Sequence, residues 1–151
     1  MRALLPVRPN GASGWIKASS VSLLRNDYAV SAERGAHRLA VTKNGRVVLR
    51  LRAGVGGSRT PTPVGALLRD GDAAQRRRST QLYGPFALGL SGFSEVLFHF
   101  KQGPGQIAIH GTGDPSTIGP DASNGCIHVS NRDVSRLAAL LPLGTPVTIV
   151  D

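Results

Sequence analysis

Two stretches of alternating apolar and polar residues, 37–43 and 46–52, flank the dipeptide Asn44-Gly45. Alternation with a period of two is typical of a strand that buries one face. An Asn-Gly dipeptide between two such runs is the strongest short-range signal for a β-hairpin, because both residues tolerate a positive φ. A hairpin must bury its apolar face against further elements, so this feature restricts the chain to β-rich folds.

The rest of the pattern predicts more strands and one late helix. Five short apolar runs, separated by Gly, Pro and Ser, are expected strands: 64–68, 86–90, 95–100, 106–109 and 147–150. Residues 131–141 show helical spacing of apolar residues after a capping-box pattern, Ser130 followed by Asp133. We therefore predict a mainly β fold, a β-sandwich or partly closed barrel of mixed sheets with one helix in the C-terminal region.

A chain of 151 residues is long enough for one domain with a short appendage. We expect residues 1–26 to form a lead-in or the remnant of a small β module, and residues 27–151 to form the main domain. In the first segment Trp15 is expected to pack on the main domain, as tryptophan is more often an anchor than a ligand platform.

The net charge of +9 favours polyanionic partners: nucleic acid, an anionic membrane or an anionic cell-wall polymer. A nucleic-acid function is disfavoured because the chain has neither a helix-turn-helix pattern nor basic strands interleaved with aromatic residues. No apolar window of about 18 residues exists, so no membrane span is expected. The arginines of the predicted hairpin, Arg46, Arg50 and Arg52, and the run 76–78 are interpreted as solvated surface.

The only cysteine, Cys126, follows Gly125 and lies sixteen positions after His110 in a loop rich in Gly, Pro, Asp and Ser. A strand that ends at His110 and a turn that ends at Cys126 would place a base beside a thiol. Contact with an imidazolium is expected to lower the thiol pKa from about 8.5 to roughly 3.5–7.5. Gly125 leaves room for close approach of a substrate, so its amide and that of Cys126 are expected to form an oxyanion hole.

The second ring nitrogen of His110 needs an acceptor, and a carboxylate or a backbone carbonyl would serve. Asp114 and Asp121 are the nearby carboxylates. His128 lies two residues beyond Cys126, so it would point to the same face of a continuing strand and contact substrate. The chain lacks C-x-x-C and H-E-x-x-H motifs, and we expect neither a metal nor an organic cofactor.

Several segments of the chain carry a resemblance to one family. They are 60–65, 83–88, 110–112, 115–119, 123–127, 131–137 and 144–149. Together they resemble the signature of the L,D-transpeptidase (YkuD-like) catalytic domain. The sequence departs from the family pattern at Asn124, where many members carry histidine, and at His128, where many carry arginine or asparagine.

The resemblance implies a cysteine acyltransferase that acts on peptidoglycan stem peptides, with Cys126 as nucleophile and His110 as base. It also implies that the Gly111 carbonyl orients His110, and that Ser123, Asn124 and Asn131 join the oxyanion and substrate-binding set. Carbapenem-type β-lactams would acylate the cysteine. Family members act outside the cytoplasm, so we expect an extracytoplasmic protein whose export signal lies upstream of this sequence.

Three alternatives remain open at this stage. Water in place of an amine acceptor would make the protein an L,D-carboxypeptidase. If the site is catalytically inactive, the protein would be a wall-binding module that uses the basic surface and Trp15. Charge alone motivates the third, a basic nucleic-acid protein.

Overall fold

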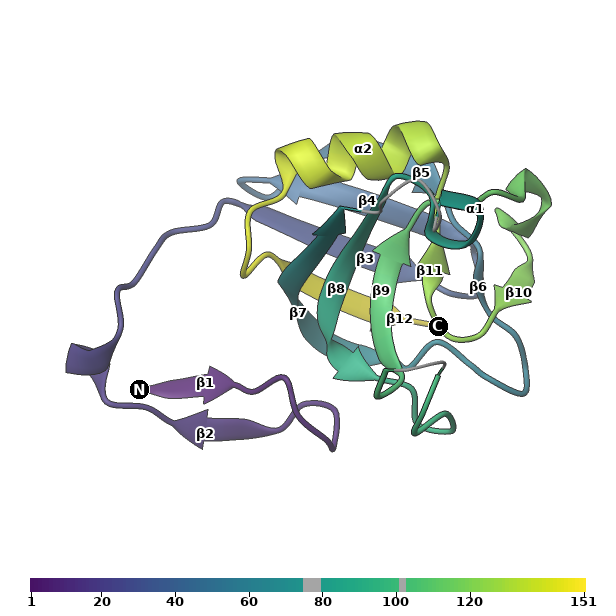
Figure 1. Cartoon of the computed structure of the whole chain (residues 1–151). Helices are drawn as coiled ribbons and strands as arrows, with labels where there is room; N and C mark the ends of the chain where they lie inside the picture. The colour runs from purple at the N-terminus through teal and green to yellow at the C-terminus, as the bar shows by residue number, and fades with distance from the viewer. Residues whose placement is uncertain (75–79, 101–102) are drawn as a thin grey trace.

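A computed structural model describes residues 1–74, 80–100 and 103–151 (Figure 1). Its centre is an eight-stranded mixed sheet that curls into a half-barrel, with strand order β11-β9-β8-β7-β12-β3-β4-β5. The strands of this sheet are β3 Tyr28–Glu33, β4 Arg38–Lys43, β5 Arg46–Arg52, β7 Gly65–Ala74, β8 Phe86–Phe93, β9 Gln106–His110, β11 Ile127–His128 and β12 Pro146–Val150. The prediction of a mainly β, partly closed barrel with one late helix is confirmed.

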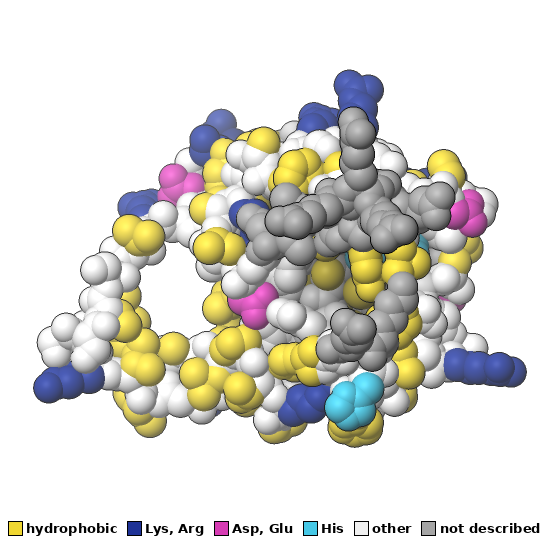
Figure 2. Space-filling view, viewed as in Figure 1, with side chains coloured by type: hydrophobic (Ala, Val, Ile, Leu, Met, Phe, Trp, Pro, Cys, Tyr) yellow, Lys and Arg dark blue, Asp and Glu magenta, His cyan; other side chains and the backbone are white. Residues whose placement is uncertain are grey.

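The hairpin of β4 and β5 forms where Asn44-Gly45 predicted it. Both turn residues have a positive φ, 49° for Asn44 and 76° for Gly45. The inward residues of this hairpin are buried, as Leu39, Val41 and Leu51 show. Its arginines lie on the exposed side, and Figure 2 shows Lys and Arg spread around the rim of the viewed face rather than gathered in one patch.

The last strand of the chain, β12, lies in the middle of the sheet. It pairs in parallel with β3 and antiparallel with β7. Its alternating residues Val147 and Ile149 are each 1% exposed and contribute to the core beneath the sheet. β12 therefore joins the β3–β5 half of the sheet to the β7–β9 half.

The late helix α2, Asn131–Leu140, covers one side of the half-barrel (Figure 1). It begins after Ser130, whose hydroxyl accepts a hydrogen bond from the Asp133 amide at 3.1 Å and donates one to the Asp133 carboxylate at 2.6 Å. This is the capping interaction that the sequence predicted. The helix buries Val134 and Leu137 against β8 and β9.

The N-terminal segment forms a two-stranded hairpin of β1, Arg2–Leu4, and β2, Ser13–Trp15, followed by a 3-10 turn at Ala18–Ser20. Figure 1 shows it beside the half-barrel and joined to β3 by an extended linker. The expectation that Trp15 packs on the main domain is wrong, because its side chain is 82% exposed. None of the helices in the described residues is long and apolar enough to cross a membrane.

Two expected strands differ in extent from the prediction. The strand expected at 64–68 is the start of β7, which continues through Asp70 to Ala74, and the basic run 76–78 lies outside the described residues. No strand forms over 95–100. β8 ends at Phe93, and the hydroxyl of Ser94 then accepts hydrogen bonds from the amides of Val96 and Leu97, which bends the chain.

Candidate active site

The histidine and the cysteine are brought together by two parallel strands. β9 ends at His110, and β11 pairs with it in the register Ile127 to Ile109 and His128 to His110. Between them the chain leaves the sheet through a 3-10 turn at Pro115–Thr117 and the short strand β10, Asp121–Ser123, which pairs with β6, Val55–Gly56. Cys126 directly precedes β11, and the backbone of Ala108 hydrogen-bonds its sulfur.

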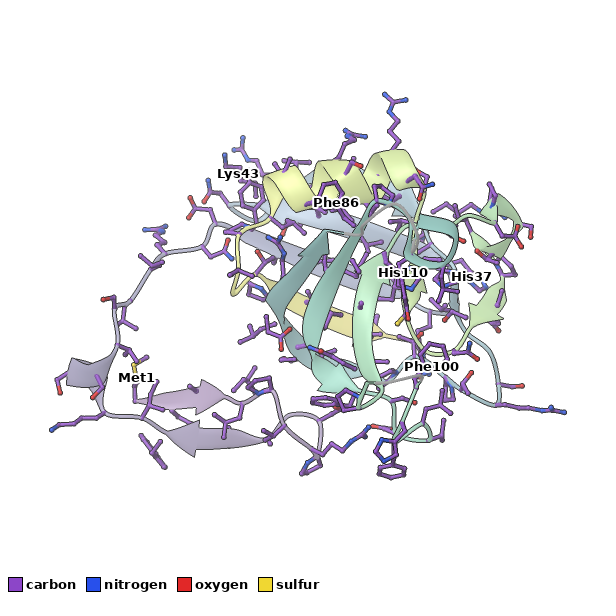
Figure 3. All side chains as sticks on the ribbon, in the orientation of Figure 1. Met1, His37, Lys43, Phe86, Phe100 and His110 are labelled. Atoms are coloured by element: carbon purple, nitrogen blue, oxygen red, sulfur yellow. The ribbon has the colours of Figure 1, made fainter. Side chains whose placement is uncertain are left out.

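Both side chains line one cavity of about 240 Å³. Its wall also includes residues from β9, from the loop after it and from the segment that follows β8. The helix α1, Thr80–Tyr83, and β11 contribute as well, and the lining residues include Tyr83, Leu97, Phe100, Thr112, Asn124 and His128. Figure 3 shows His110 at the end of β9 and Phe100 near the other end of that strand.

His110 is held in one tautomer by its own neighbour. Nδ1 lies 2.6 Å from the carbonyl oxygen of Gly111, which can only accept, so Nδ1 carries the proton and Nε2 keeps a lone pair. The residue is 2% exposed, and its ring packs edge-on against Tyr83 at a centroid distance of 4.8 Å. The backbone carbonyl, rather than a carboxylate, is therefore the orienting group.

The two carboxylates considered from the sequence are engaged elsewhere. Asp114 caps the turn that follows it, because its Oδ1 accepts from the amide and the hydroxyl of Ser116 at 2.9 and 2.6 Å. Asp121 lies 3.7 Å from Nε2 of His37. Neither contacts His110, because the loop carries both side chains to the exposed surface.

A tight backbone crossing fixes the Gly111 carbonyl. The side-chain oxygen of Asn131 accepts a hydrogen bond from the Thr112 amide at 2.9 Å. A Cβ at Gly111 would lie 2.2 Å from that oxygen and 3.1 Å from Cα of Gly84. Asn131 is not among the residues that line the cavity, and its side chain holds the segment that follows His110.

The turn before Cys126 is closed by the hydroxyl of Ser123. This hydroxyl accepts from the Gly125 amide at 3.1 Å and donates to the Cys126 carbonyl at 2.5 Å. Gly125 has φ of +111°, a conformation that L side chains rarely adopt. Within the described part of the chain, no acceptor takes the Cys126 amide, whereas the Gly125 amide is already bonded to Ser123.

Burial favours the neutral forms of both Cys126 and His110. Loss of solvent raises the pKa of Cys126 to about 11, an effect that the hydrogen bond from Ala108 only partly offsets. Burial likewise lowers the pKa of His110 to about 4, against the opposing effect of the Gly111 carbonyl. The expectation of a thiol pKa lowered by an imidazolium is therefore wrong, because desolvation penalises both charges of such a pair.

His128 lies beside His110, opposite it in the pairing of β11 with β9. The ring centroids are 4.5 Å apart, and Nδ1 of His128 lies 3.0 Å from the hydroxyl of Thr117. Burial lowers the pKa of His128 as well. Thr117 and Tyr83 were not predicted as site residues, although both lie in segments, 115–119 and 83–88, that resemble the family signature. Thr117 is in the turn after the strand that carries His110, and Tyr83 ends the short helix α1, Thr80–Tyr83.

No group of three His, Cys, Asp or Glu side chains among the described residues could hold a metal ion. The fold and the site thus define a β-rich protein with a cysteine–histidine pair in a cavity at one end of a curled mixed sheet. The chain belongs to the family of the L,D-transpeptidase catalytic domain (YkuD), whose model matches residues 27–149.

Relatives and solved structures agree with this family. The chain is 32% identical over 153 residues to the candidate L,D-transpeptidase YkuD of Bacillus subtilis (strain 168), covering 97% of this chain and 84% of the relative. The structure of Bdellovibrio bacteriovorus Bd1075 superposes with a TM-score of 0.65 at 26% identity, covering 83% of this chain and 48% of that chain. L,D-transpeptidase 3 from Mycobacterium tuberculosis, solved in complex with a faropenem-derived adduct, shares the fold with a TM-score of 0.64 at 16% identity over 83% and 61% of the two chains.

Proposed function

We propose that the protein is a cysteine-dependent peptidoglycan L,D-transpeptidase. The observation that carries the proposal is the tautomer of His110. Its Nδ1 proton is committed to Gly111, so Nε2 is available as a base in the cavity that Cys126 also lines. L,D-transpeptidases act on peptidoglycan peptides, which makes a tetrapeptide stem the expected donor.

The first half of the reaction forms a thioester. The Cys126 sulfur attacks the carbonyl of the third stem residue while His110 Nε2 takes the thiol proton. The neutral resting pair suits this step, because the proton moves only as the S–C bond forms and no buried ion pair has to exist beforehand. The C–N bond to the terminal D-Ala then breaks, and His110 returns the proton to the departing amine.

The oxyanion of this step is assigned to the Cys126 amide. That amide has no acceptor among the described residues, and one such donor typically lowers the barrier by about 3 kcal/mol. The Gly125 amide contributes only if it leaves Ser123. Gly125 and Ser123 therefore shape the turn first, and His128 and Asn124 would contact the substrate because both line the cavity.

The second half transfers the acyl group to an amine of a neighbouring stem, which gives a 3→3 cross-link and frees the thiol. Water in place of the amine would give an L,D-carboxypeptidase. Neither route requires a metal or an organic cofactor. The substrate implies an extracytoplasmic site of action, where anionic wall polymers would also meet the basic surface.

The test is incubation with purified disaccharide-tetrapeptides, followed by mass spectrometry of the products. We expect cross-linked dimers and free D-Ala with the native protein, and neither with Cys126→Ala or His110→Ala. Arg2→Ala is the control, because Arg2 donates to Ser13 on the N-terminal hairpin and lines no part of this cavity. Release of D-Ala without dimers would show that the protein is an L,D-carboxypeptidase instead. If neither the tetrapeptide nor a carbapenem forms an adduct on Cys126, the protein is a wall-binding module without this activity.

A further inference from the structure

The N-terminal hairpin contacts the catalytic domain through Arg8, which lies between β1 and β2. Its guanidinium donates to three backbone carbonyls: Nη1 to Ser94 at 2.6 Å, and Nη2 to Pro104 at 2.8 Å and to Leu97 at 3.3 Å. The same group lies over two rings, with Cζ 5.0 Å from the centroid of Phe93 and 4.8 Å from that of Phe98. A planar guanidinium fork can satisfy several acceptors at once, which an ammonium cannot do in the same geometry.

The three carbonyls belong to both limbs of the segment between β8 and β9. We call its described residues, 94–100 and 103–105, the cavity wall. Ser94, Leu97, Phe100 and Gly105 of this wall line the same cavity as His110 and Cys126. Arg8 therefore joins the two limbs of the wall on the side away from the reacting atoms, since Arg8 itself does not line the cavity.

Asn10 supplies a second attachment at the start of the wall. Its side-chain amide donates to the carbonyl of Phe93 and accepts from the amide of the same residue, both at 2.8 Å. These two hydrogen bonds replace those that the backbone of a neighbouring strand would make with Phe93 at the end of β8. Ser94 then bonds to the far limb, because its amide donates to the carbonyl of Gly105 at 2.8 Å.

We infer that Arg8 and Asn10 are positioning residues, and that the N-terminal hairpin sets the shape of the wall against which the donor peptide lies. The inference rests on the proposed function for the identity of the donor. Without the two side chains the wall has to be ordered by the incoming peptide, which weakens binding. The chemical step is unaffected, because neither side chain touches the reacting atoms.

The kinetic test compares Arg8→Ala, Arg8→Lys and Asn10→Ala with Arg2→Ala. Arg2 is a matched control on the same hairpin, where it donates to Ser13 and reaches no part of the wall. We expect KM for the disaccharide-tetrapeptide to rise about tenfold in the three wall variants, with kcat within about twofold of native, as for a loss of binding that precedes chemistry. An equal fall in kcat with KM unchanged would overturn the inference.

Two measurements separate this inference from the proposed function. Amide hydrogen exchange at Leu97 and Phe100 should be about tenfold faster in the wall variants than in Arg2→Ala. Labelling of Cys126 by a bulky maleimide should rise relative to labelling by iodoacetamide. If the native protein leaves muropeptides unchanged but these two effects appear, the proposed function fails and the role of the hairpin stands. If Arg8→Lys and Asn10→Ala match Arg2→Ala in both hydrogen exchange and Cys126 labelling, the role of the hairpin fails.

Discussion

The protonation state of Cys126 gives the sharpest test of the site, and pH is the perturbation. The structure raises the thiol pKa from an ordinary value of 9.0 to about 11 by burial. At pH 8 a thiol with the ordinary value is about 10% thiolate, whereas one with a pKa of about 11 is about 0.1% thiolate, and the thiolate is the reactive form. A more basic thiolate is intrinsically more nucleophilic, which recovers roughly tenfold of this loss, so alkylation of Cys126 at pH 8 should be about tenfold slower in the folded protein than in the unfolded chain.

The assay is the rate of iodoacetamide addition between pH 6 and 10, followed by intact mass. Cys126 is the only cysteine, so each addition reports one site, and the urea-unfolded protein is the internal reference. We expect the rate to rise tenfold per pH unit with no plateau up to pH 10, and His110→Ala to show the same slope. A plateau below about pH 8 that disappears in His110→Ala would refute the reasoning, because it would reveal a thiolate–imidazolium pair at rest.

Three further outcomes are expected. The pKa of His110 is about 4 in the folded protein and 6.5 in the unfolded chain, so the unfolded state binds more protons between these two pH values. The free energy of unfolding should therefore fall by up to about 3 kcal/mol from pH 6.5 to pH 4. In urea titrations at several pH values, His110→Gln should lose much of this pH dependence. Gly111→Ala should reduce the rate of thioester formation more than tenfold, because the added Cβ would clash with the side-chain oxygen of Asn131. The double variant Gly111→Ala/Asn131→Ala lacks that oxygen, so the clash should be relieved. If the two substitutions instead lower the rate additively, this contact is contradicted. Gly125→Ala should cost about 1–3 kcal/mol by chemical denaturation, owing to its φ of +111°, and an undiminished acylation rate would show that this turn does not position the thiol.

Local signals in the sequence predicted the elements that depend on near neighbours. The hairpin around Asn44-Gly45 and the helix after Ser130 each require only a few adjacent residues, and both form where expected. The placement of His110 and Cys126 at one cavity was also accessible, because a strand, a turn-rich loop and a second short strand are close in sequence. The spacing of the motif therefore carried the geometry of the site.

Features set by distant parts of the chain were not predictable in the same way. The thiol pKa depends on how much solvent the folded sheet removes, and the sequence pattern does not report this. The end of β8 is fixed by Asn10 and Ser94, so the expected strand at 95–100 competes with contacts from the other end of the chain. Trp15 resembles an anchor by type, but the hairpin is attached through Arg8 and leaves the indole in solvent.

The central position of β12 has a consequence for when the buried environment of Cys126 can form. Residues 146–150 are the last to leave the ribosome among those of the sheet, and they separate the half that carries the cysteine from the half that carries the β4–β5 hairpin. Until they arrive, neither half has its neighbour, and the assembly of the whole sheet waits for contacts of long sequence separation. The buried, high-pKa thiol therefore forms only after residues 146–150 have joined the two halves of the sheet.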